Sequence, residues 1–250
     1  GRAAAPVRLV HLGLGNFYRA HQAWYTDQSP DAGDWGYAAF SGHSRDLPDR
    51  LTAQDGLYTL ISRAEDGDSF DVVSSVSKAH SADDHAAWLS YFGSPELGVV
   101  TLTVTEAGYL RDADGGLDAG RPDVQADLAA LRADPAALVR TAPARLVAGL
   151  TMRRRTGAGP MSIVPCDNLP GNGAIAERVI RDFAYLLDPT LVEWLDTSLA
   201  IVTTTVDRIT PRASASDLET VRTVTGVRDE CPVVTEPFKE WVLSGAFPAG

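Results

Sequence analysis

The chain has 250 residues, with 22 Lys or Arg against 33 Asp or Glu, so its formal net charge is −11. This charge disfavours a nucleic-acid-binding surface, which needs clustered basic residues to neutralise phosphates. Apolar residues make up 44% of the sequence, and the length fits one large domain or two small ones. No apolar run is long enough to span a membrane. Cys166 and Cys231 are too few for a disulfide framework or a metal site, so we expect a reducing, cytoplasmic setting.

The order of the predicted elements is that of an α/β fold. Short apolar runs predict strands at residues 7–12, 35–40, 58–63, 69–75, 99–105, 161–164 and 200–206. Helical patterns are expected at 17–28, 83–91, 123–132, 135–155, 173–187 and 190–195. Strands that alternate with helices indicate a Rossmann-like, doubly wound and mainly parallel sheet. The segments 58–63 and 69–75 have the spacing of a small β-hairpin beside that sheet.

A glycine pair, Gly13 and Gly15, follows the first predicted strand. The first glycine permits a tight turn, and the second removes a side chain where a pyrophosphate would approach the start of the next helix. The third glycine of the usual dinucleotide fingerprint is replaced by Tyr18. A single glycine pair is a weak signal, so two interpretations stay open: a dinucleotide-binding turn and a turn that only shapes the backbone.

The loop after the second predicted strand bears on the choice between NAD and NADP. Asp46 would suit the ribose diol of NAD, although capping of the next helix is the preferred role for this carboxylate. The hydroxyls of Ser41 and Ser44 and the guanidinium of Arg45 would instead suit the 2′-phosphate of NADP. The sequence leaves the choice between the two cofactors open, with a slight preference for NADP tolerance.

Five blocks of sequence carry a more specific signal. They read GLGNFYRAH at 13–21, AQDGLYTL at 53–60, TVTEAGY at 103–109, CDNLPGNG at 166–173 and TTVDRITP at 204–211. In this order they resemble the motifs of the mannitol dehydrogenase family, the polyol-specific long-chain dehydrogenases that include fructuronate and tagaturonate reductases. Ile201 and Val202 depart from the phenylalanine and proline that this family usually has ahead of the last block.

The resemblance implies an NAD(P)-binding Rossmann-type domain over residues 1–250, with 212–250 leading into a helical C-terminal substrate domain. The implied reaction is reversible hydride transfer between NAD or NADP and a secondary alcohol of a polyol or sugar acid, of the mannitol/fructose or fructuronate type. The family's catalytic lysine stands in a K-x-x-x-x-N-x-x-H arrangement, which neither Lys78 nor Lys239 fits. We therefore expect an N-terminal domain that is inactive without the rest of a longer enzyme.

Two candidate catalytic residues follow from the resemblance. Glu106 is placed beside the nicotinamide, where a carboxylate could orient the ring amide or join a proton relay. Asn168 is implied to supply half of a pair that stabilises the substrate alkoxide. The alternative for Asn168 is an ordinary turn asparagine. The further cofactor contacts implied are Asn16, Phe17, Arg19, Thr105, Val206 and Asp207.

Two of these contacts have structural alternatives. Arg19 could be a solvated arginine on a helix face, and Asp207 with Arg208 could form an ion pair that only fixes its loop.

A short-chain dehydrogenase is excluded because no tyrosine is followed four residues later by a lysine. An S-adenosylmethionine-dependent methyltransferase and a stand-alone dinucleotide-sensing module remain as alternative functions.

Overall fold

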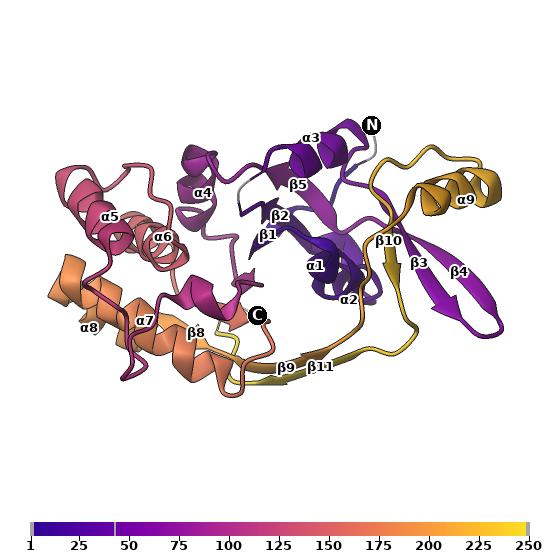
Figure 1. Cartoon of the computed structure of the whole chain (residues 1–250). Coiled ribbons are helices and arrows are strands. Elements are labelled where there is room, and N and C mark those ends of the chain that lie inside the picture. Colours follow the sequence, from indigo (N-terminus) through magenta and orange to yellow (C-terminus); the bar gives the residue numbers. More distant parts are fainter. Residues whose placement is uncertain (1–2, 43, 249–250) are drawn as a thin grey trace. The chain divides into compact units, whose positions relative to one another are not determined.

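The computed structural model describes residues 3–42 and 44–248. His43, in the loop considered for cofactor choice, and both ends of the expected 1–250 domain lie outside the described residues. The chain divides into two compact units, unit 1 with residues 1–82 and 206–241 and unit 2 with residues 83–205 and 242–250. Both units combine strands and helices (Figure 1).

The first sheet of unit 1 contains three parallel strands in the order β5-β2-β1. These are β1 (Val7–Leu12), β2 (Gly36–Phe40) and β5 (Val76–His80). The predicted strands at 7–12 and 35–40 are confirmed, whereas β5 was not predicted. All five residues of β2 are buried, as expected for a parallel strand covered on both faces.

The second sheet of unit 1 has the order β10-β3-β4. It contains β3 (Tyr58–Ala64), β4 (Gly67–Val73) and β10 (Val233–Thr235), and the antiparallel β3–β4 pair is the expected hairpin. In Figure 1 this hairpin extends beside β10 and α9 (Ala215–Thr225). Ile61, Val221 and Val234 form a small core between these elements. The other helices of this unit are α1 (Asn16–Ala20), α2 (Gln22–Asp27), η1 (Ala32–Asp34) and α3 (Asp46–Ala53).

The helix expected at 17–28 is broken in two at His21, whose backbone angles of −118° and −88° are not helical. The break frees carbonyl groups that a continuous helix would use. The carbonyl oxygen of Arg19 accepts a hydrogen bond from the Tyr58 hydroxyl at 2.6 Å, and that of Ala20 accepts one from Arg208. Because these partners come from distant segments, the break could not be predicted from local sequence.

Unit 2 contains a parallel set of strands in the order β6-β7-β8. These are β6 (Val99–Leu102), β7 (Met161–Pro165) and β8 (Leu199–Ile201). The helices are α4 (His85–Phe92), η2 (Glu106–Tyr109), α5 (Pro122–Ala133), α6 (Ala142–Thr156), α7 (Asn172–Leu187) and α8 (Pro189–Ser198). The strand expected at 200–206 is divided between β8 and β9 (Thr203–Asp207), and β9 pairs with β11 (Glu240–Ser244).

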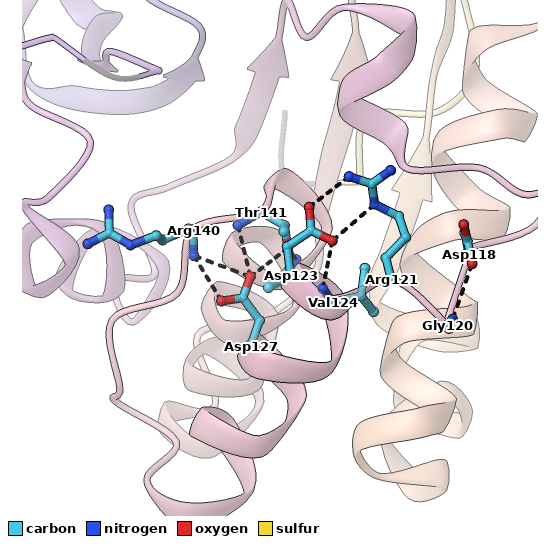
Figure 2. A network of polar contacts seen from close by, with 9 residues as sticks. Asp118, Gly120, Arg121, Asp123, Val124, Asp127, Arg140 and Thr141 are labelled. Atoms are coloured by element: carbon cyan, nitrogen blue, oxygen red, sulfur yellow. Dashed lines mark hydrogen bonds and ion pairs between the residues drawn. The ribbon is translucent and has the colours of Figure 1, made fainter.

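The helix expected at 135–155 begins only at Ala142, because the buried carboxylate of Asp127 holds the preceding backbone in a loop (Figure 2). Asp127 accepts hydrogen bonds from the backbone N–H groups of Arg140 and Thr141 at 3.1 and 2.9 Å. The Thr141 side chain then caps α6 by accepting a hydrogen bond from the N–H of Ala144 at 3.3 Å. A tertiary contact therefore sets this boundary.

None of the helices in residues 3–42 and 44–248 is both long and apolar enough to cross a membrane. Within the same ranges, no three His, Cys, Asp or Glu side chains are grouped so that they could hold a metal ion.

Candidate functional site

The glycine turn at the end of β1 has an open geometry. Gly13 has a φ of +115°, which favours glycine, and the N–H groups of Gly13 and Leu14 both donate to the Phe40 carbonyl at 3.0 and 2.9 Å. Gly15 precedes α1 with an extended backbone. A Cβ added to Gly15 would meet only the Gly13 carbonyl oxygen, at 3.5 Å. The backbone conformation therefore favours glycine at position 13, whereas packing does not require it at position 15, where the missing side chain leaves space at the start of α1.

The residues of α1 are fixed by contacts within unit 1. Arg19 is 3% exposed and donates to the carbonyl of Cys231, to the carbonyl of Gly15 at 3.3 Å and to Oδ1 of Asn16 at 2.8 Å. The alternative of a solvated arginine is therefore wrong. Phe17 stacks on His21 with ring centroids 4.9 Å apart.

The loop after β2 uses its serines internally. Ser41 is buried and its hydroxyl donates to the Ser44 carbonyl at 2.6 Å, while the Ser44 hydroxyl accepts from the N–H of Asp46 at 3.1 Å. Arg45 is exposed, and its guanidinium has no partner among the described residues. Asp46 begins α3 without capping it through its side chain and pairs instead with Arg50. Of the three groups considered for a 2′-phosphate, the guanidinium is therefore the freest.

Val206 and Asp207 end β9, the first buried and the second exposed. The loop that follows is fixed by Arg208, which donates to the Ala20 carbonyl and, at 3.4 Å, to the Glu236 carbonyl. Its guanidinium also lies over the Trp24 ring, 5.0 Å from the centroid. Arg208 thus holds the loop through carbonyl groups and an aromatic face.

A polar network around residues 229–231 was not predicted from the sequence. Gln54 donates to Asp229 at 2.9 Å and accepts from the N–H of Glu230 at 2.7 Å. Asp229 also accepts from the N–H groups of Thr59 and Cys231 at 2.5 and 2.9 Å. Burial raises the pKa of the Cys231 thiol to about 12, so this thiol stays neutral. The sequence blocks that contain Gln54, Thr59 and Arg19 therefore converge on one segment near the C-terminal end of the chain.

Glu106 lies in unit 2, in the first turn of η2, directly after Thr105. Both residues are exposed. The strand before them ends at Leu102, three residues earlier than predicted. The side chain of Glu106 is 66% exposed and pairs with Arg111 at 2.9 Å. This carboxylate is accessible and close to a cation.

Asn168 is exposed in the loop between β7 and α7, and its side chain makes no hydrogen bond within the described ranges. The loop around it is rigidly held. Asp167 accepts hydrogen bonds from the Tyr109 hydroxyl and from the N–H of Leu169, the latter at 3.1 Å. Burial and the neighbouring Asp167 raise the pKa of Tyr109, so the phenol stays protonated as the donor.

The fully buried Asn172 completes this frame. Its amide donates to the carbonyls of Pro165 and Asp167 at 3.2 and 3.0 Å, and its oxygen accepts from the N–H of Thr204 at 3.0 Å. Asn172 therefore starts α7 and shapes the turn before it. Within unit 2, the Tyr109–Asp167 bond joins the segment of Glu106 to that of Asn168.

Within unit 1, the glycine turn and the loop at 41–46 follow the carboxyl ends of two neighbouring parallel strands, β1 and β2. This is the edge at which open α/β sheets bind ligands. The unit therefore has the architecture of a Rossmann-like nucleotide-binding protein.

Comparison with known proteins gives the family. Residues 7–250 match the model of the mannitol dehydrogenase Rossmann domain. Mannitol 2-dehydrogenase of Cereibacter sphaeroides is 38% identical over 255 residues, which cover 100% of this chain and 52% of that protein. The uncharacterized oxidoreductase YeiQ of Escherichia coli is 37% identical over 249 residues, covering 97% of this chain and 50% of that protein.

A solved structure agrees with these matches. Pseudomonas fluorescens mannitol 2-dehydrogenase, in a ternary complex with NAD and D-mannitol, superposes with a TM-score of 0.89 at 35% identity, covering 98% of this chain and 51% of that chain. The chain therefore belongs to the mannitol dehydrogenase Rossmann domain family, and the expected Rossmann-like α/β class is confirmed. It spans about half the length of these relatives.

Proposed function

We propose that this chain is the dinucleotide-binding part of an NAD(P)-dependent dehydrogenase that oxidises a secondary alcohol of a polyol or sugar acid. The observation that carries the proposal is the open glycine turn at the end of β1, where Gly15 has no packing reason to be glycine. The solved relative bound to NAD and D-mannitol supports the same assignment.

The turn fits the pyrophosphate of such a cofactor. The N–H groups of Gly13 and Leu14 are used by the Phe40 carbonyl, so binding would rely on backbone at Gly15 and Asn16, at the start of α1. The missing side chain at Gly15 lets an anion approach the N–H groups of the first helical turn. Arg19 stabilises this turn through its bonds to the Gly15 carbonyl and to Asn16.

The roles of Glu106 and Asn168 belong to the same proposal. The bound cofactor supplies the hydride acceptor or donor. The exposed amide of Asn168, on a loop fixed by Asp167 and Asn172, is suited to donate a hydrogen bond to the alkoxide oxygen of the substrate. The exposed carboxylate of Glu106 is suited to accept and release a proton at the surface.

The substrate would be a mannitol-like polyol or a keto-uronate, which would exchange a hydride reversibly with the cofactor. Neither lysine of the chain fits the family's catalytic arrangement. We therefore expect cofactor binding with little or no turnover from this chain alone. A methyltransferase would bind S-adenosylmethionine instead, and a sensing module would bind nucleotide without supporting catalysis in any longer form of the protein.

Gly15→Ala is expected to weaken NADH binding about tenfold or more, because the new methyl group occupies the space through which a pyrophosphate approaches. The melting temperature should stay close to that of the wild type, since the added Cβ makes only one ordinary contact. NADH titration by calorimetry measures the first effect and thermal unfolding the second. Gly33→Ala is the matched control, because a Cβ there meets nothing within 4 Å. Unchanged NADH affinity in Gly15→Ala would contradict the proposed site.

A further inference from the structure

A pocket of about 270 Å³ lies in unit 1 beside the glycine turn. Its wall includes Asn16 and Arg19 of α1 together with Leu47 and Arg50 of α3. The segment that follows β9 closes it with Arg212. The pocket therefore touches both the helix that follows β1 and the helix that follows β2, which in this fold class flank the pyrophosphate and the adenosine ribose.

The lining carries an excess of positive charge. Arg19, Arg50 and Arg212 face a single acidic residue, Glu230, whose carboxylate is paired with Arg228 at 2.7 Å. Arg212 is exposed and has no ion-pair partner in the ranges that the structure describes. In a chain with a net charge of −11, a cavity of this kind concentrates an anionic group of a ligand.

Arg50 is held in place with part of its donor capacity unused. Its guanidinium pairs with Asp46 and donates to the Glu230 carbonyl at 3.0 Å. Its Nε–H is buried and finds no acceptor among the described residues. The pairing with Asp46 also neutralises the carboxylate that follows β2, which would otherwise repel a phosphate on the ribose.

A larger neighbouring hollow of about 640 Å³ differs from this pocket in the balance of its charges. There the arginines alternate with carboxylates, and Arg222 pairs with Glu219 at 3.7 Å. Its charges are balanced, so it offers no net attraction to a phosphate. The smaller pocket is the one whose charge and position both suit an anion.

We propose that this pocket receives the 2′-phosphate of NADP, with Arg50 and Arg212 as the residues that determine the cofactor preference. This inference rests on the proposed function, because the pyrophosphate must lie at the glycine turn for the ribose to reach the pocket. Guanidinium groups match a phosphate dianion in charge and in hydrogen-bonding geometry.

The test compares two nucleotides that differ only in the 2′-phosphate, adenosine 2′,5′-bisphosphate and 5′-AMP, by calorimetric titration of the whole chain. We expect the bisphosphate to bind about tenfold tighter, and NADPH tighter than NADH. Arg212→Gln and Arg50→Gln should each remove most of this difference and leave the affinity for NADH within about twofold. Arg222→Gln, in the larger charge-balanced hollow, should change neither the affinity ratio of the two adenine nucleotides nor that of NADPH and NADH.

The outcomes separate the two proposals. Equal binding of the two adenine nucleotides, or a preference that both substitutions leave unchanged, would overturn the 2′-phosphate pocket while NADH binding still supports the proposed function. Failure of NADH, NADPH and both nucleotides to bind a folded chain would overturn the proposed function and this inference together. Because Arg212 is exposed and its side chain forms no hydrogen bond or ion pair in the described ranges, its variant is expected to fold normally.

Discussion

Arg153→Ala is expected to lower the free energy of unfolding by about 3–5 kcal/mol, a large part of the stability of a typical domain. Arg153 is 1% exposed on the inner face of α6. Its guanidinium donates to the carbonyls of Gly159, Ala158 and Pro160 at 2.7, 3.0 and 3.0 Å. It also reaches the carbonyls of Phe92 and Ser94, where α4 ends.

The magnitude follows from what the substitution leaves behind. Five carbonyl groups would lose a donor, among them the buried ones of Phe92 and Ala158, and a cavity the size of the side chain would open between α4, α6 and β7. Arg153→Lys should recover part of the loss, because an ammonium has three donors where the guanidinium has five. Denaturant unfolding of these variants and of Arg155→Ala, an exposed position on the same helix, measures the effect. Equal stability of Arg153→Ala and Arg155→Ala would contradict it.

The stability of the chain is expected to fall as the pH drops from about 6.5 towards 4, ahead of most carboxylate titration. Burial lowers the pKa of His11 to about 3 and that of His21 to about 4. His11 is stacked on Tyr18 at 3.7 Å, and His21 packs against Phe17, Tyr25 and Trp241. Both imidazoles are therefore neutral in the folded chain.

The sign of this effect follows from linkage. Below the unfolded pKa of 6.5, the unfolded chain binds protons that the folded chain does not, so each lower pH unit costs at most about 1.4 kcal/mol per histidine. Unfolding free energies measured from pH 7 to 4.5 should decline by up to about 5 kcal/mol. His21→Gln should flatten the slope by about one proton. An unfolding free energy that does not change between pH 6.5 and 5 would contradict this prediction.

The elements that the sequence predicted well are those whose signal is local. The strand at 7–12, its glycine turn and the hairpin at 58–73 all depend on neighbouring residues, and the structure has them. The predicted start of α6 was wrong because it is set by a hydrogen bond from the backbone of Arg140 to the carboxylate of Asp127, thirteen residues earlier. The prediction of one continuous helix at 17–28 was wrong because Tyr58 and Arg208 donate hydrogen bonds to the carbonyl groups at its break.

The candidate site shows the same division. The glycine turn and the candidate residues Asn168 and Glu106 were proposed from motifs. The pocket with Arg50 and Arg212 could not, because its residues belong to segments that the fold alone brings together. Arg19 stands in a recognisable motif, yet its burial depends on the carbonyl of Cys231, which is 212 positions away. A motif indicates that a residue matters, and only the tertiary structure shows which atoms it contacts.

We expect the glycine turn of unit 1 to bind a nicotinamide dinucleotide. The direct test is calorimetric titration of the folded chain with NADH and with S-adenosylmethionine. Saturable binding of NADH, one molecule per chain, is expected, with no heat from S-adenosylmethionine. Absence of NADH binding by a chain whose circular dichroism shows it folded, or binding of S-adenosylmethionine instead, would contradict the proposed dinucleotide site.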